Sequence, residues 1–289
     1  MIILIQIKGV EYEMREENNL LSDIKPIFHT IIFEIKKQIK KIVFFTIFTL
    51  LILILQNVVL QALISINPLP LTQTGFYSNG LGFFNLIALF SACFFFSGVI
   101  CEEYSTKTGY ILFPKINKFE LIIGKYIGNL IIVTFITTLF YCFLGLFGFY
   151  YYGGLMNIRF FYSYGIALLY IITLSSFVTF FSSFMKSVNL TIISTVLILL
   201  IGFNLADQIV TLVGAGNIEP LYSITYMGNL ITSVLNETFP NPRYYEETFG
   251  NFTIGRWITP SIEMGITLMV IYILGYFIFG ALLFKRRQL

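Results

Sequence analysis

The chain has 289 residues, of which 57% are hydrophobic and 11% are charged, and its formal net charge is +3. Soluble domains carry roughly 25% charged residues, so this composition excludes a soluble globular enzyme and a disordered chain. The basic residues are too few and too dispersed for a nucleic-acid-binding surface. The composition therefore predicts an all-α, polytopic integral membrane protein.

The chain begins with residues 1–24, which we expect to form a cytoplasmic segment, followed by an amphipathic helix over residues 25–41. In that helix, Ile27, Ile31, Ile35 and Ile39 recur at helical spacing, and charged residues fall on the other faces. A basic amphipathic helix that runs into a span is typical of an elbow lying at the membrane interface. A helix packed on a partner protein would show the same pattern, and the residues do not separate the two.

Residues 42–289 form the predicted transmembrane domain. A spanning helix needs about 20 mostly apolar residues, and six stretches meet this requirement. Apart from Glu263 at the start of the sixth stretch and Asp207 near the end of the fifth, they contain no charged residue. The predicted spans are Ile42–Ile64, Phe83–Cys101, Tyr126–Tyr150, Tyr164–Phe184, Val188–Val210 and Ile262–Phe284.

The positions of the basic residues predict the orientation. Fifteen Lys and Arg residues precede the first span or lie in the second connection, the fourth connection and the tail, and only three, Arg159, Arg243 and Arg256, lie on the other side. Because Lys and Arg are enriched in cytoplasmic loops, both termini are predicted to be cytoplasmic. We expect the protein to lie in the plasma membrane.

The long connection over residues 211–258 is then extracellular. It contains the apolar stretch Leu221–Leu235, which Gly228 and Asn229 interrupt. Fifteen residues are too few to span, so this stretch is predicted to be a re-entrant or interfacial helix. Asn236 and Asn251 each begin a glycosylation acceptor pattern, Asn-X-Thr.

Signatures of catalysis are absent from the sequence. There is no GxxxxGK[ST] phosphate-binding loop, and His29 is the only histidine, so we expect no enzymatic activity, cofactor or metal site in this chain. Neither a mid-membrane acid nor an interrupted span is evident, which argues against an ion-driven carrier. Asn57, Asn204 and Asp207 are costly to bury, and they are candidates for a pathway or a subunit interface.

The connection over residues 102–125 mixes charges of both signs with apolar side chains such as Tyr110, Phe113 and Phe119. A purely solvated loop has no need of these apolar groups. The composition favours a short helix whose apolar face docks into a groove of another protein. Tyr110 and Phe113 could instead lie in the membrane interface, where aromatic residues are common.

This connection resembles the cytoplasmic loop of ABC type-2 permeases, the membrane subunits of ATP-binding-cassette exporters. That loop typically runs E-Y-S-x-G-T, then L-x-x-P, then an element like P-I-S-R, and closes with G-K before the third span. The matching residues are Glu103-Tyr104-Ser105, Thr108, Leu112, Ile116-Asn117-Lys118 and Gly124-Lys125. The departures are Lys107 where glycine is usual, Lys115 where proline is usual, Lys118 for arginine, and Pro114 one place early.

The resemblance implies that two permease subunits, identical or homologous, form the translocation pathway in the bilayer. Separate cytoplasmic ATPase subunits would drive them through a coupling helix within residues 102–125. The residues expected to take part in ATPase coupling are Glu103, Lys107, Tyr110, Phe113, Pro114, Asn117, Lys118 and Glu120. The alternative is a non-transporting membrane scaffold or assembly factor with the same fold.

Overall fold

The computed structural model describes residues 25–57, 70–109, 117–211, 217–236, 238–239, 242–249 and 252–287. Six helical stretches in these ranges are long and apolar enough to cross a membrane, in agreement with the six predicted spans. They are Ile39–Asn57, Gln73–Ser105, Lys118–Tyr152, Ile158–Phe184, Val188–Val210 and Ile262–Arg286. The predicted segment 1–24 lies outside the described residues.

Several of the six stretches are divided into shorter elements. Residues 25–37 are helical, and after a turn at Gln38 the chain continues as α2 (Ile39–Ile54). The second stretch consists of α3 (Gln73–Gly80), α4 (Phe84–Phe96) and α5 (Gly98–Ser105). The remaining elements are α7 (Lys118–Tyr152), α8 (Ile158–Phe184), α9 (Val188–Leu197), the π-helical turn η2 (Ile198–Gly202), α10 (Phe203–Val210) and α13 (Ile262–Arg286).

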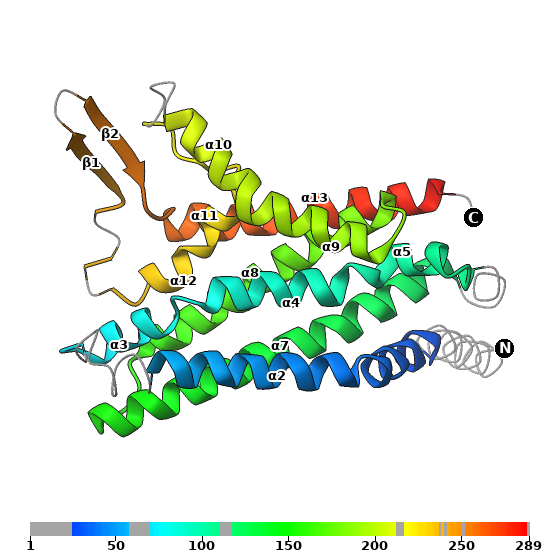
Figure 1. Ribbon diagram of the computed structural model, residues 1–289, viewed down its shortest axis with the longest axis horizontal. Helices are drawn as coiled ribbons and strands as arrows, with labels where there is room; N and C mark the ends of the chain where they lie inside the picture. The colour runs from blue at the N-terminus through cyan, green and yellow to red at the C-terminus, as the bar shows by residue number, and fades with distance from the viewer. Residues whose placement is uncertain are drawn as a thin grey trace, which may run out of the picture.

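The helices form an elongated bundle around α8, which contacts α4, α5, α7, α9 and α13. Helix 25–37, α5, the start of α7 and the end of α13 lie at one end of the bundle, which we call the terminal end (Figure 1). The short helices α11 (Ile224–Gly228) and α12 (Leu230–Ser233) and the strands β1 (Tyr244–Phe249) and β2 (Phe252–Trp257) lie at the opposite end, the hairpin end. The two ends of the bundle are therefore built from different segments of the chain.

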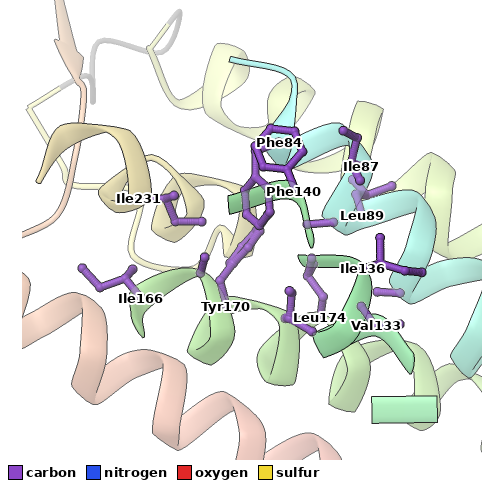
Figure 2. Packing of buried hydrophobic residues seen from close by; sticks show 14 of the residues in the cluster. Phe84, Ile87, Leu89, Val133, Ile136, Phe140, Ile166, Tyr170, Leu174 and Ile231 are labelled. Atoms are coloured by element: carbon purple, nitrogen blue, oxygen red, sulfur yellow. The ribbon is translucent and has the colours of Figure 1, made fainter. Parts of the chain in front are cut away.

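The core lies where α4, α7, α8 and α12 meet (Figure 2). Phe84 of α4 packs against Phe140 of α7 with the ring centroids 5.3 Å apart, and Tyr170 of α8 lies beside them. Lipid tails are as apolar as these side chains, so close packing rather than exclusion of water holds such helices together. The other labelled core residues are Ile87, Leu89, Val133, Ile136, Ile166, Leu174 and Ile231, all buried.

The second spanning stretch is interrupted twice, which corrects the expectation of uninterrupted spans. Between α3 and α4, the side-chain amide of Gln56 donates a hydrogen bond to the carbonyl oxygen of Asn79. Between α4 and α5, Ser182 Oγ of α8 accepts hydrogen bonds from the amides of Ile100 (3.1 Å) and Cys101 (3.0 Å) and donates to the carbonyl oxygen of Ser97 (2.7 Å). Side chains of neighbouring helices thus bind the backbone groups that each break releases.

The apolar stretch 221–235 forms α11 and α12 rather than one helix, and the division falls at the interrupting pair Gly228 and Asn229. A Cβ atom at Gly228 would lie 2.9 Å from Tyr170 Cζ, so only glycine lets α11 approach α8 this closely. The antiparallel hairpin β1–β2, in which Tyr244 pairs with Trp257, was not predicted. Asn236 is exposed, and Asn251 lies outside the described residues.

Candidate functional site

Five charged side chains meet at the terminal end, and we call them the ionic cluster. Glu34 and Lys37 come from helix 25–37, Glu102 and Glu103 from α5, and Lys125 from α7. Glu34, Glu103 and Lys125 are between 2% and 4% exposed, so three of the five charges are fully buried. Charges this deeply buried are stable only when they are paired.

The pairing links all three helices. Lys125 Nζ forms an ion pair with Glu103 Oε1 and lies 3.9 Å from Glu102 Oε2. Lys37 Nζ lies 2.5 Å from Glu102 Oε2 and 3.8 Å from Glu34 Oε2. Three acids and two bases leave the cluster with a formal charge of −1. Thr108 donates a 2.5 Å hydrogen bond to Glu103 Oε2, which supports the second oxygen of this carboxylate.

Two glycines bring helix 25–37 against α7. A Cβ atom at Gly124 would lie 2.7 Å from Thr30 Cβ and 3.1 Å from the carbonyl oxygen of Ile27. A Cβ atom at Gly128, one turn further along α7, would lie 3.3 Å from Glu34 Cβ. The adjacent pair Gly124-Lys125 therefore supplies both the close approach of the helices and the cation of the cluster.

Helix 25–37 turns polar side chains toward α7. Thr30, Glu34 and Gln38 recur every four residues and are buried, and Gln38 Nε2 donates a 3.0 Å hydrogen bond to Glu34 Oε1. The apolar side chains of Phe28 and Phe33 are 58% and 63% exposed. The apolar row noted in the sequence, Ile27, Ile31, Ile35 and Ile39, is half-buried in its first three members and exposed at the last. The helix is amphipathic, but the face that packs inside the protein is the polar one formed by Thr30, Glu34 and Gln38.

Four of the remaining residues predicted for ATPase coupling are described, and they lie just after α5 or at the start of α7. Lys107, just after α5, has a φ of 59°, in the left-handed region that favours glycine. Asn117 caps α7, accepting a hydrogen bond from the Phe119 amide at 3.3 Å, and Glu120 lies in the first turn. Lys118 Nζ lies 5.7 Å from the ring centroid of Phe284 on α13. Tyr110, Phe113 and Pro114 lie outside the described residues.

A cavity of about 810 Å³ opens at the hairpin end, between α4, α8, η2, α10, α11 and β2. It brings together two of the three polar residues predicted for a pathway or interface, Asn204 and Asp207. The third, Asn57, is not in its lining. Asn57 is buried in the first spanning stretch, where its side chain bonds the carbonyl oxygen of Leu53 at 3.0 Å.

Asp207 has one side-chain partner in the cavity wall. Tyr222 donates a 2.7 Å hydrogen bond to Asp207 Oδ1, and burial together with this carboxylate raises the pKa of Tyr222 to about 12. The phenol therefore remains a donor at physiological pH. Beside it, Arg243 forms a 2.5 Å ion pair with Glu219, so these two charges cancel.

The sequence analysis missed Glu34 and Lys37 as members of the ionic cluster, and it missed Ser182 at the break between α4 and α5. The four-residue spacing of Thr30, Glu34 and Gln38 was the available signal for a buried polar stripe. No comparable local pattern marks Ser182, since its partners are about 80 residues away in sequence.

Comparison with known proteins adds no assignment, since no protein-family model and no curated protein matches this chain. Within the described residues, no group of three or more His, Cys, Asp or Glu side chains could hold a metal ion. The ionic cluster joins three helices and borders a second cavity of about 680 Å³, so both ends of the bundle have room for a ligand.

Proposed function

We propose that this chain is the permease subunit of an ATP-binding-cassette exporter. It lies in the plasma membrane with both termini on the cytoplasmic side. A second permease subunit, identical or homologous, completes the translocation pathway. Separate cytoplasmic ATPase subunits bind at the terminal end, around residues 102–125, and drive transport. Hydrolysis takes place in those subunits and not in this chain.

The observation that carries the proposal is the ion pair between Glu103 and Lys125. These two residues bracket the connection that resembles the permease coupling loop, so their pairing clamps the base of that connection. Lys37 adds helix 25–37 to the same junction through Glu102. A push on the connection would therefore move α5, α7 and helix 25–37 together.

This rigidity is what coupling requires. A contiguous, stiff connection between its docking surface and the spanning helices lets a soluble motor act on those helices. A flexible tether would absorb the movement of the motor without passing it on. The buried charges also make the junction specific, because separating them would leave a carboxylate unpaired at low dielectric.

The backbone at the connection also supports the resemblance. The family usually has glycine where this chain has Lys107, and the left-handed φ of 59° at Lys107 is the conformation for which glycine is suited. In the closing pair, Gly124 allows helix 25–37 to approach α7, and Lys125 supplies the cation that pairs with Glu103. The conformation of Lys107 is thus one that the glycine usual in the family would also adopt.

Purification from native membranes in a mild detergent tests the proposal. We expect an ATPase with a phosphate-binding loop to co-purify in stoichiometric amount. Phe119 lies in the first turn of α7 and is 41% exposed, so Phe119→Ala should weaken this association by about fivefold or more, as loss of a buried interface anchor does. Phe113→Ala should act similarly if its ring docks in the partner.

Phe149→Ala is the matched control, because Phe149 is also exposed on α7 but lies near the opposite end of that helix. It should leave association unchanged. A folded, monodisperse chain that retains no ATPase would contradict the proposal and favour the scaffold. Equal effects of Phe119→Ala and Phe149→Ala would reject the docking surface at the start of α7.

A further inference from the structure

The cavity at the hairpin end has the size of a small-molecule site. Its volume of about 810 Å³ lies within the roughly 300–1,000 Å³ typical of ligand pockets. Tyr170, whose ring packs beneath Gly228, and Leu89 belong to both the core and the cavity lining, so one wall is rigid. Trp257 of β2 and Tyr222 contribute further aromatic surface. An apolar ring would find extensive contact here.

Among the described residues, the lining of the cavity carries one charge. Asp207 is the only charged residue among the described lining residues, and it forms no ion pair with any described residue. Tyr222 binds Oδ1, whereas Oδ2 has no hydrogen-bond partner within the described chain. The nearby Arg243, 5.5 Å from the Trp257 ring centroid, is neutralised by Glu219. A cation entering the cavity would therefore meet a free carboxylate oxygen.

A second polar group in the lining lacks a partner. Asn85 Oδ1 of α4 is buried, and none of the described residues donates a hydrogen bond to it. A buried acceptor without a donor is unfavourable, and a ligand N–H group that reached it would satisfy it. This unpaired acceptor favours a hydrogen-bond donor, and the charge of Asp207 favours a cation over an anion or a purely apolar molecule.

We propose that this cavity is a binding site for a small organic cation that combines an apolar ring with hydrogen-bond donors. Asp207 binds the positive charge, Asn85 accepts an N–H group, and the aromatic walls hold the ring, since aromatic faces attract cations as well as apolar groups. The inference stands apart from the proposed permease function, because binding requires neither an ATPase nor transport.

Trp257 makes the site directly measurable, because it is the only tryptophan in the chain. The probe is 1-methylnicotinamide, an aromatic cation with amide N–H donors that quenches tryptophan fluorescence. Nicotinamide has the same ring and amide without the charge. In the purified chain we expect saturable, static quenching by 1-methylnicotinamide, with an apparent affinity at least about tenfold higher than that of nicotinamide.

Three variants separate a binding site from general electrostatic attraction. Asp207→Asn should remove most of the tenfold preference for the cation, and Asn85→Ala should weaken both probes. Glu263→Gln, which removes an exposed acid at the start of α13 outside the cavity lining, should leave both affinities unchanged. Each variant is compared only as a monodisperse, folded preparation, and Asn85→Ala provides a second test if Asp207→Asn does not fold.

Two results would overturn the proposal. One is quenching that rises linearly with concentration and equally for both probes, which indicates collision without binding. The other is an unchanged preference for the cation in Asp207→Asn together with unchanged binding in Asn85→Ala. Either result leaves the ATPase docking surface untouched, because that surface lies at the other end of the bundle.

Discussion

Replacing Lys125 by methionine should destabilise the protein more than any change at an exposed lysine. The substitution keeps the length of the side chain but removes the positive charge that pairs with Glu103, which is 4% exposed. Thr108 then remains as the hydrogen-bond partner of that carboxylate. Breaking a buried pair on one side costs about 3–5 kcal/mol, since the other charge stays buried without compensation.

The partner substitution tests this explanation. The double variant Lys125→Met/Glu103→Gln removes both charges of the pair and leaves the net charge of the cluster unchanged, so most of the lost stability should return, with a net loss of about 1 kcal/mol. The coupling free energy between the two sites should then be about 2 kcal/mol or more. For a chain of this size, about 3 kcal/mol corresponds to a fall of roughly 6–12 °C in melting temperature.

The assay is a heating series in detergent, with the folded fraction measured by size-exclusion chromatography. Lys36→Met is the matched control, because Lys36 lies on helix 25–37 but is exposed and forms no ion pair within the described chain. It should change the melting temperature by less than about 2 °C. Additive effects of Lys125→Met and Glu103→Gln would refute the reasoning, as would equal losses in Lys125→Met and Lys36→Met.

Three further predictions concern the backbone and the orientation. Lys107→Val should lower stability by about 1–2 kcal/mol, whereas Lys107→Gly should preserve or raise it, as measured by melting temperature, because φ at this position is 59°. Ser182→Ala should lower the free energy of unfolding by about 1–3 kcal/mol in the same assay, because it leaves buried backbone groups between α4 and α5 without their partner. Ser183→Ala should lower it less, because it loses only a bond within its own helix. In a cysteine-free chain, a cysteine at Asn236 should react with an impermeant reagent outside the cell and one at Asn117 should not; the reverse pattern would invert the orientation.

The spans could be predicted from sequence because length and apolar composition are local properties. The second-span prediction was least complete, since Phe83–Cys101 covers only part of Gln73–Ser105 and does not reveal the breaks near Gly82 and Ser97. Those breaks depend on Gln56 and Ser182, which lie on other helices. Local sequence cannot specify a partner on another element.

The ionic cluster could not be predicted from the sequence for the same reason. Lys125 and Glu103 are 22 residues apart, and Lys37 and Glu102 are 65 apart, so their pairing depends on how the helices pack. The sequence did indicate the Gly124-Lys125 element, and it named Asn204 and Asp207 as polar candidates without indicating that they line one cavity. It did not indicate that Glu34 turns inward, because the isoleucine row on the same helix predicted an amphipathic elbow at the membrane interface or a helix packed on a partner protein. Close contact through Gly124 and Gly128 favoured the polar face instead.

The central claim is that a soluble ATPase docks at the terminal end of this chain. Site-specific photo-crosslinking in intact cells tests it most directly, with the crosslinker placed at Asn117, the exposed cap of α7, or at Asn236, which is exposed near the hairpin end. The account predicts that the crosslinker at Asn117 captures a protein with a phosphate-binding loop and that the crosslinker at Asn236 does not. Capture of such an ATPase from Asn236, or from neither position in a folded protein, would contradict it.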